Sequence, residues 1–284
     1  MKKNIRLVLA LIMLTILFTG CAGGGSNDIV VVSREDGSGT RGAFIELFGI
    51  EEKDANGNKV DNTTDEATVV NSTSIVMTTV AGNKNSIGYI SLGSLNDTVK
   101  AVKIDGTEPT VENIKNNAYK VFRPFNIATK EDLSELAQDF IRFILSKDGQ
   151  KVVEDNGYIA FSEEGPYSGT KPSGKIVVAG SSSVTPVMEK LKEAYLKLNT
   201  NAEIEIQISD STTGMNSVME GTCDIGMTSR ELTEGELKSL KSTVIAMDGL
   251  AVIVNKENTI SNITSDQIKA IFKGEITSWN DVAE

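Results

Sequence analysis

The chain has 284 residues, of which 39% are hydrophobic; this is enough to bury the core of one or two globular domains, so a disordered chain and a mini-protein are excluded. It contains no histidine, which excludes Ser-His-Asp and Cys-His catalysis and zinc sites that use histidine, because each of them needs an imidazole. The net charge of −11 and the aromatic content of 5% argue against a nucleic acid partner, because an acidic protein repels phosphate backbones and offers few rings for base stacking.

Residues 1–20 have the pattern of an export signal. Three basic residues precede an apolar run, 7–18, that is too short to span a bilayer. Cys21 follows small residues, as in a bacterial lipobox, and the glycine-rich stretch behind it has the composition of a flexible tether. We therefore expect cleavage after residue 20, a lipid anchor on Cys21 and a tether over residues 21–27. The alternative is an ordinary cleaved signal with an incidental cysteine.

After the tether, short β-rich runs alternate with amphipathic helical stretches, which is the pattern of α/β domains with central sheets. The predicted strands are 29–33, 87–90, 121–127, 175–179, 203–207 and 250–255, and the clearest predicted helices are 131–145, 186–198 and 265–272. A polar stretch, 49–64, is predicted to be a surface loop, and Lys-Pro-Ser-Gly at 171–174 is the best candidate for a junction in mid-chain.

A first Ser/Thr/Gly cluster follows the first predicted strand and opens a short helix, 43–48. It reads Arg34-Glu-Asp-Gly-Ser38-Gly39-Thr40. The glycines let consecutive N–H groups converge, and the helix N-terminus adds about half a positive charge. Ser38 and Thr40 supply hydroxyl groups, and Arg34 supplies a planar fork that suits a tetrahedral oxyanion. We interpret this segment as an anion cradle.

Two further clusters repeat the arrangement of strand, hydroxyl groups and helix. Residues 180–186 read Gly-Ser-Ser-Ser-Val-Thr-Pro and come before the helix 186–198, while residues 210–214 read Asp-Ser-Thr-Thr-Gly and come before a short helix, 215–220. Each cluster alone is typical of an ordinary helix cap, because Ser and Thr are common capping residues. Three such clusters in one chain, one of them with an arginine, favour a shared anion site.

Together with Asp-Ile-Gly-Met-Thr-Ser-Arg-Glu at 224–231, these motifs closely resemble the phosphate-binding protein of bacterial ABC-type phosphate uptake systems. The likeness covers residues 28–284 and includes Ile-Gly-Tyr at 87–89 and the segment 274–281. In that family the segment resembling 175–284 comes first. The chain therefore resembles a circular permutant whose former ends are joined through residues 167–174. The alternative, a mis-assembled gene with two partial copies, is disfavoured because no segment is duplicated.

The resemblance implies an α/β fold of two lobes, the type II periplasmic-binding-protein fold, joined by two hinge-crossing strands. We place the crossings near Val121–Phe125 and Leu250–Asn255. Lobe A is then contiguous, 123–250, and lobe B is split, 28–122 plus 251–284. The implied protein is a monomeric, extracytoplasmic lipoprotein that closes over inorganic phosphate and delivers it to the membrane permease of an ABC transporter, with no enzymatic activity, cofactor or metal.

The resemblance also implies the residues that bind phosphate. They are Ser182, Ser183, Ser211 and Ser229 from lobe A, and Arg34, Ser38, Gly39 and Thr40 from lobe B; further candidates are Ser181, Thr228, Asp36 and Arg230, with Arg41 as another supplementary cation. Many family members have Asp where this chain has Ser229, and that carboxylate accepts the proton of monohydrogen phosphate and repels sulfate. Here Asp36, Asp210, Glu231 or a backbone carbonyl are alternative acceptors, or Asp36 instead orients Arg34.

Other functions remain open at this stage. A binding protein for sulfate, molybdate or a phosphonate, and a surface lipoprotein that senses phosphate or adheres without transport, both fit the same motifs. The G-x-G-x-x-G match at 37–42 and the S-x-x-K match at 168–171 are weak, because neither has the structural context that its chemistry needs. Trp279 is the only tryptophan. We expect it beside the site loop, so that its fluorescence reports closure.

Overall fold

The computed structural model describes residues 27–162 and 164–282. Its strands are β1 (Val30–Arg34), β2 (Glu51–Lys53), β3 (Lys59–Asp61), β4 (Thr68–Val70), β5 (Ser86–Ser91), β6 (Lys100–Ala101), β7 (Lys103–Ile104), β8 (Phe122–Thr129), β9 (Gly174–Ser181), β10 (Ala202–Ser209), β11 (Ile225–Thr228), β12 (Lys241–Val254) and β13 (Asn262–Ile263). Its α-helices are α2 (Gly39–Leu47), α3 (Thr73–Gly82), α4 (Val111–Lys115), α5 (Glu135–Leu145), α6 (Lys147–Asp155), α7 (Thr185–Leu198), α8 (Ser211–Glu220) and α9 (Ser265–Phe272). Short 3₁₀ turns are η2 (Leu92–Ser94), η3 (Glu236–Lys238) and η4 (Trp279–Asp281).

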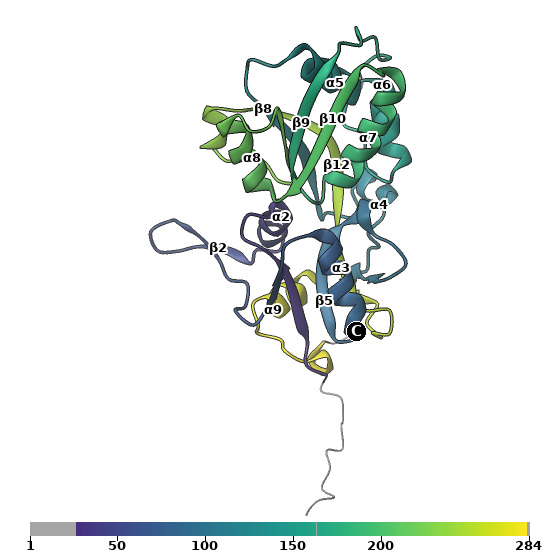
Figure 1. Ribbon diagram of the computed structural model, residues 1–284. Helices are drawn as coiled ribbons and strands as arrows, with labels where there is room; N and C mark the ends of the chain where they lie inside the picture. The colour runs from purple at the N-terminus through teal and green to yellow at the C-terminus, as the bar shows by residue number, and fades with distance from the viewer. Residues whose placement is uncertain (1–26, 163, 283–284) are drawn as a thin grey trace, which may run out of the picture.

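The main sheet runs through both halves of the molecule. Its strand order is β10-β9-β11-β8-β12-β5-β1-β4, with β6 also paired to β12. The outer pairs β10/β9, β9/β11, β5/β1 and β1/β4 are parallel, whereas the central pairs β11/β8, β8/β12 and β12/β5 are antiparallel. Figure 1 shows the result as two lobes, one above the other, with β12 descending from the upper lobe to their junction.

Each lobe has apolar side chains buried on both faces of its part of the sheet. In the upper lobe of Figure 1, one core lies under α5, α6 and α7, and a second lies under α8. In the lower lobe, one core lies under α2, α4 and α9, and a second lies under α3. Within the described ranges, no helix is both long and apolar enough to cross a membrane.

The strands β8 and β12 pass from one core to the other. Phe125 and Ala246 pack in the upper core, while Val121 and Leu250 pack in the lower core. A register shift between Val244 and Ala246 marks a bulge in β12 just before the crossing, where an extra residue bends a strand and increases its twist. The crossing in β12 thus lies between Ala246 and Leu250. The predicted range for this crossing, 250–255, therefore lies too far along the chain.

Several other element boundaries differ from the predictions. The predicted helices 43–48 and 215–220 are α2 and α8, which begin four residues earlier, at Gly39 and Ser211. The stretch 49–64 is not a plain loop, because β2 and β3 pair in it as an antiparallel hairpin. Its turn is held by the Asp54 carboxylate, which accepts hydrogen bonds from the N–H groups of Asn56 and Asn58, each 2.8 Å long. The helix predicted over 131–145 begins at Glu135, because the Ser134 hydroxyl accepts from the N–H of Ala137 and caps it there.

The mid-chain junction is anchored by one buried carboxylate. Asp139 on α5 accepts hydrogen bonds from the hydroxyl groups of Tyr167, at 2.6 Å, and Tyr195, at 2.8 Å, and from the N–H of Thr170, at 3.2 Å. Burial alone would raise the pKa of Asp139, but these donors and the guanidinium of Arg142 outweigh it and hold the pKa below its usual value. The charged form of Asp139 therefore ties residues 167–170 to the helices of the upper lobe.

Replacing this carboxylate should destabilise the protein in a pH-dependent way. We expect Asp139→Asn to lower the free energy of unfolding at pH 7 by about 2 to 3 kcal/mol, since hydrogen bonds to a charged group are lost. Because the folded pKa is depressed, this contribution is present above the ordinary carboxyl pKa and is lost as the pH falls through the folded value, so the two proteins should begin to converge only below about pH 4.

Urea unfolding of both proteins at pH 7 and at acidic pH measures the effect. Asp155→Asn is the matched control, since Asp155 forms an exposed ion pair with Lys151 on α6 and its loss should cost no more than about 0.5 kcal/mol. Equal losses for the two variants would contradict the anchoring role of Asp139.

Candidate functional site

Within the described residues, four helices begin at the junction of the lobes. Ser38 caps α2, Ser72 caps α3 and Asp210 caps α8, each accepting from a backbone N–H of the first turn. The fourth helix, α7, starts at Thr185, two residues after the serine run that begins at the last residue of β9, Ser181. Free N–H groups and helix dipoles at such N-termini attract anions.

Buried hydroxyl groups from these N-termini and from the end of β11 form one group, which we call the hydroxyl cluster. Its members are Thr40, Thr73, Ser181, Ser182, Ser183, Ser211 and Ser229, all of them buried. Ser229 lies at its centre: its hydroxyl accepts from Ser181 at 3.0 Å and lies 3.4 Å from the hydroxyls of Thr40 and Ser211. The Ser229 N–H also donates to the Ser211 hydroxyl at 3.1 Å.

The cluster joins the two lobes directly. The Ser183 hydroxyl in the upper lobe shares hydrogen bonds of 2.7 Å with Thr40 and 3.0 Å with Thr73, both in the lower lobe. The backbone must also come close here, because a Cβ atom on Gly39 would lie 2.4 Å from the Ser211 hydroxyl and 2.9 Å from that of Ser229. Glycine at position 39 is therefore required for the lobes to meet at this distance.

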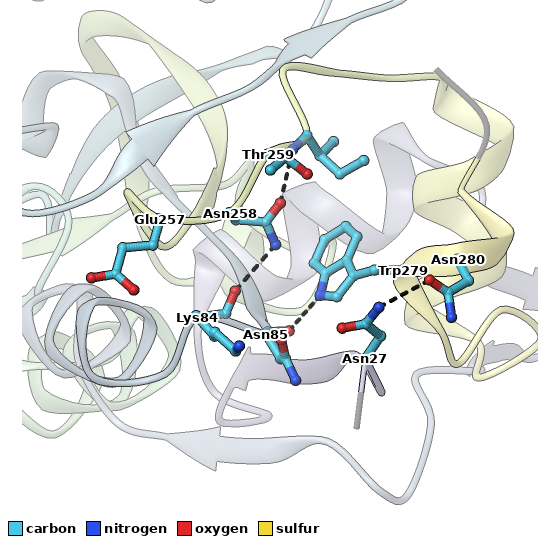
Figure 2. A pocket seen from close by; sticks show the side chains of 9 residues that line it. Asn27, Lys84, Asn85, Glu257, Asn258, Thr259, Trp279 and Asn280 are labelled. Carbon is cyan, nitrogen blue, oxygen red and sulfur yellow. Dashed lines mark hydrogen bonds between the residues drawn. The ribbon is translucent and has the colours of Figure 1, made fainter. Parts of the chain in front are cut away.

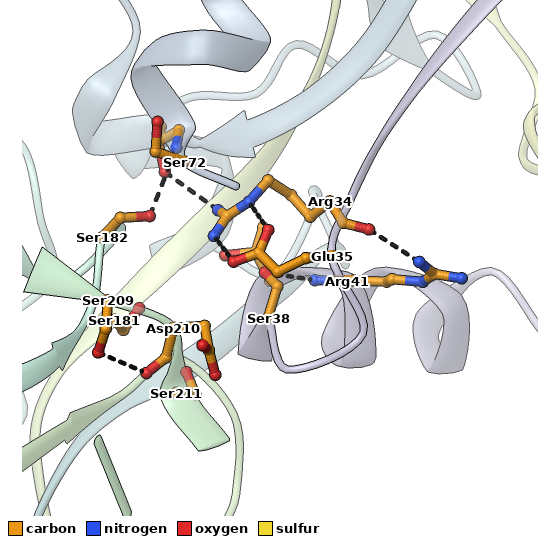
Figure 3. A network of polar contacts seen from close by, with 12 residues as sticks. Arg34, Glu35, Ser38, Arg41, Ser72, Ser181, Ser182, Ser209, Asp210 and Ser211 are labelled. Carbon is orange, nitrogen blue, oxygen red and sulfur yellow. Dashed lines mark hydrogen bonds and ion pairs between the residues drawn. The ribbon is translucent and has the colours of Figure 1, made fainter. Parts of the chain in front are cut away.

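The positive charge of the site is Arg34, at the end of β1. Its guanidinium is 2% exposed and forms a bidentate ion pair with Glu35, with both N–O distances at 2.7 Å. The Nη1 atom lies 3.5 Å from the Thr73 hydroxyl, and Figure 3 shows Arg34 directed toward the start of α3. Arginine has five N–H donors and these three contacts use only three of them, so the fork retains hydrogens for an anion.

The structure brings most of the predicted site residues together. Arg34, Gly39, Thr40, Ser181, Ser182, Ser183, Ser211 and Ser229 all lie in or against the hydroxyl cluster. Ser38 lies at the same N-terminus and caps α2 through the N–H of Arg41. These contacts are between groups of the protein itself, so the predicted roles of these residues in binding a ligand stay predictions.

Four of the further candidates have their polar groups engaged by partners outside the cluster. The side chain of Asp36 is 96% exposed and pairs with Arg41, so the prediction that it orients Arg34 is wrong; Glu35 does so instead. The guanidinium of Arg230 is taken up by Glu236, at 2.9 Å for both contacts, and the Thr228 hydroxyl donates to the carbonyl of Arg230. Arg41 is likewise occupied, by Asp36, Asp61 and the carbonyl of Arg34.

Sequence reasoning missed Thr73 and Glu35. A signal for Thr73 was available, because Ser72-Thr73-Ser74 precedes an apolar helix in the same way as the other clusters. Nothing local distinguishes Glu35 from Asp36 as the partner of Arg34, since the choice depends on where the turn after β1 directs each side chain.

The chemistry that the side chains of the hydroxyl cluster offer is hydrogen bonding. These side chains are hydroxyls, which both donate and accept hydrogen bonds. Among residues 27–162 and 164–282, no three Cys, Asp or Glu side chains come close enough to hold a metal ion.

Comparison with known proteins identifies the family. The family model described as "PBP superfamily domain" matches residues 14–148 and 165–284. The "Phosphate-binding protein PstS 2" of Streptococcus agalactiae is 56% identical over 274 residues, which are 94% of each chain. A crystal structure of a phosphate-binding protein of a phosphate ABC transporter from Streptococcus pneumoniae covers 90% of this chain and 100% of its own, with 48% identity and a TM-score of 0.70.

The chain belongs to this family of phosphate-binding proteins in the PBP superfamily. The predicted family and the α/β periplasmic-binding-protein fold are thereby confirmed. This family member is collinear with the Streptococcus agalactiae relative, whereas the "Phosphate-binding protein PstS" of Bacillus subtilis, at 33% identity, aligns over only 39% of this chain and 38% of its own. The predicted circular permutation relative to other members stays a prediction.

Trp279 of this family member lies away from the hydroxyl cluster. Its indole N–H donates to the carbonyl of Asn85 at 2.9 Å, and its backbone N–H donates to the carbonyl of Asn27 at 2.9 Å. It lines a cavity of about 320 Å³ at the start of β1 (Figure 2). Because β1 separates it from Arg34 by about 16 Å, the prediction that it lies beside the site loop is wrong.

The tryptophan emission of this family member should therefore not report ligand binding. We expect the same emission spectrum with and without phosphate at concentrations that saturate binding by calorimetry, because the surroundings of Trp279 all belong to one end of the lower lobe. Acrylamide quenching in both states is a second readout. A spectral shift that follows the calorimetric curve would contradict this placement.

Proposed function

We propose that this protein captures inorganic phosphate between its two lobes and delivers it to the membrane permease of an ABC transporter. The observation that supports this function most is that the buried hydroxyl cluster, the helix N-termini and Arg34 converge at the lobe junction. The names of the family members that match almost the whole chain support the same ligand and transport role.

The site supplies the donors that a tetrahedral oxyanion needs. An anion that enters between the lobes replaces hydroxyl–hydroxyl bonds, such as that between Thr40 and Ser183, with bonds from both hydroxyls to its own oxygens. The predicted ligands are Ser182, Ser183, Ser211, Ser229, Arg34, Ser38, Gly39 and Thr40, and we add Thr73. About five charge-assisted hydrogen bonds of roughly 1.5 to 3 kcal/mol each suffice for sub-micromolar affinity after ordering costs.

A broader anion specificity is the second candidate function. No carboxylate is available in the hydroxyl cluster as described, since Glu35 is paired with Arg34, Asp36 with Arg41, and the Asp210 carboxylate caps α8. The proton of monohydrogen phosphate then has only hydroxyl or carbonyl oxygens to receive it. A hydroxyl can also turn and donate to sulfate, so discrimination between these two anions rests on Ser229 and its neighbours.

We further propose that the protein is an extracytoplasmic, monomeric binding protein and not an enzyme. The export signal (1–20), the lipid-anchor residue Cys21 and all of the tether (21–27) except its last residue lie outside the described residues, and the proposal for them rests on the sequence pattern. The sequence has no histidine, and the hydroxyl cluster has no other general base, which supports binding without catalysis.

The lobes and their order in the chain are also part of this proposal. Lobe A comprises 123–250 and lobe B comprises 28–122 plus 251–284. The separate cores support a division near these residues, although Leu250 itself packs in the core of lobe B. In a permuted chain, the segment 167–174 joins the former termini, and the tether attaches to lobe B. The hydrogen bonds from Tyr167 and Thr170 to Asp139 hold this segment against α5.

Calorimetric titration of the mature domain, stripped of bound anion, tests the function. We expect sub-micromolar binding of phosphate at pH 8. Sulfate binding at least a thousandfold weaker would support phosphate capture, whereas comparable sulfate binding would favour the general oxyanion receptor. Absence of heat with both anions would refute both functions.

The close approach at Gly39 offers a test of where the anion binds. Gly39→Ala should weaken phosphate binding by about tenfold or more, which corresponds to about 1.4 kcal/mol, because the added methyl group would overlap the hydroxyls of Ser211 and Ser229. Gly42→Ala is the matched control on the same helix, since its Cβ would meet nothing nearer than 3.7 Å. Equal affinities of the two variants would place the site elsewhere.

A further inference from the structure

A buried ion pair connects the two strands that cross between the lobes. Arg123 on β8 and Asp248 on β12 are opposite each other in the register of the sheet. Their side chains are 2% and 1% exposed, and Nη2 of Arg123 lies 3.3 Å from a carboxylate oxygen of Asp248. A buried ion pair is weak evidence for a stabilising role, because desolvation offsets much of the attraction, so another role must be considered.

The two members of the pair contact different lobes. Nη1 of Arg123 donates to the carbonyl oxygen of Ser229 at 3.1 Å, and Ser229 is the centre of the hydroxyl cluster. The other carboxylate oxygen of Asp248 accepts from the Ser91 hydroxyl at 2.8 Å and from the N–H of Gly93 at 3.4 Å, both in the lower lobe. Asp248 is thus held by residues of the lower lobe, while Arg123 extends to the hydroxyl cluster at the lobe junction.

Arg123 is only partly neutralised by its partner. It makes a single contact of 3.3 Å to Asp248, in contrast to the two contacts of 2.7 Å between Arg34 and Glu35. Its Nε atom is buried and has no hydrogen-bond partner among the described residues. The remaining face of the guanidinium lies over the ring of Phe125, 5.2 Å from its centroid. Positive charge is therefore left next to Ser229.

The two buried arginines also interact with each other. Burial lowers the pKa of Arg123 to about 10, and the positive charge of Arg34 adds to this lowering although Asp248 opposes it. Two like charges in a buried site repel, and an anion bound against Arg34 relieves that repulsion.

We propose that Arg123 is a second cation of the anion site. It holds the turn at Ser229 and acts on bound phosphate through that turn, while Asp248 keeps Arg123 at the hinge. This inference rests on the proposed function. Arg123 is a positioning residue in this account, because its contact is with the carbonyl of Ser229 and not with the ligand. Since the Ser229 N–H is held by Ser211, the two contacts together hold the central hydroxyl in place.

The test compares variants that give different results if Arg123 acts through its charge than if it only stabilises the fold. Arg123→Met, which removes the charge and the donor, should weaken phosphate binding by about tenfold or more. Arg123→Lys keeps the charge and should recover part of this loss. Asp248→Asn keeps the positive charge but removes the carboxylate that holds Arg123 at the hinge, so it should weaken phosphate binding by less than Arg123→Met does.

Calorimetry gives the phosphate affinity of each variant, and urea unfolding gives its stability. Arg142→Met is the matched control, because this arginine is half exposed and pairs with Asp139 away from the hydroxyl cluster; it should lose stability and keep its affinity. Affinity that falls in proportion to lost stability in every variant would overturn the inference, as would an unchanged affinity of Arg123→Met. A wild-type protein that binds no phosphate would overturn the proposed function together with this inference.

Discussion

The antiparallel pairing of β8 with β12 is the constraint on which the rest of the structure depends. These strands place one sheet in both lobes, so every element of the anion site is positioned relative to the same two strands. The bulge in β12 before the crossing turns the strand from one core to the other. The ends of β1, β9, β10 and β11 are thereby directed toward the lobe junction, where their hydroxyl and N–H groups meet.

An acidic protein can bind an anion in this way because the attraction is local. The net charge of −11 acts through solvent, where it is screened within about a Debye length. Inside the lobe junction, helix dipoles, N–H groups and a buried guanidinium act at short range and in a medium of lower dielectric constant. The arrangement of the groups therefore matters more to binding than the total charge of the chain.

The pairing of charged side chains shows where sequence reasoning stops. The motif around Arg34 is visible in the sequence, but the identity of its partner is not, because Glu35 and Asp36 are adjacent and differ only in the direction that the turn imposes. Arg123 and Asp248 are far apart in the chain, and they become neighbours only through strand register. Trp279 was misplaced for the same reason, since its position depends on the pairing of Ser278 with Asp28 at the start of β1.

The sequence by itself determined the α/β class, six of the nine strands of the main sheet, five of the eight α-helices in the described residues, the family resemblance and the hydroxyl-rich segments that begin the helices. These features depend on hydrophobic periodicity, capping residues and local motifs, which act over a few neighbouring residues. Only the tertiary structure decided the extent of β12, the hairpin within 49–64, the inclusion of Thr73, the pairing of Arg34 with Glu35, and the buried pair at the hinge. Those depend on contacts between residues distant in the chain, and long-range register and burial are not encoded in any short segment.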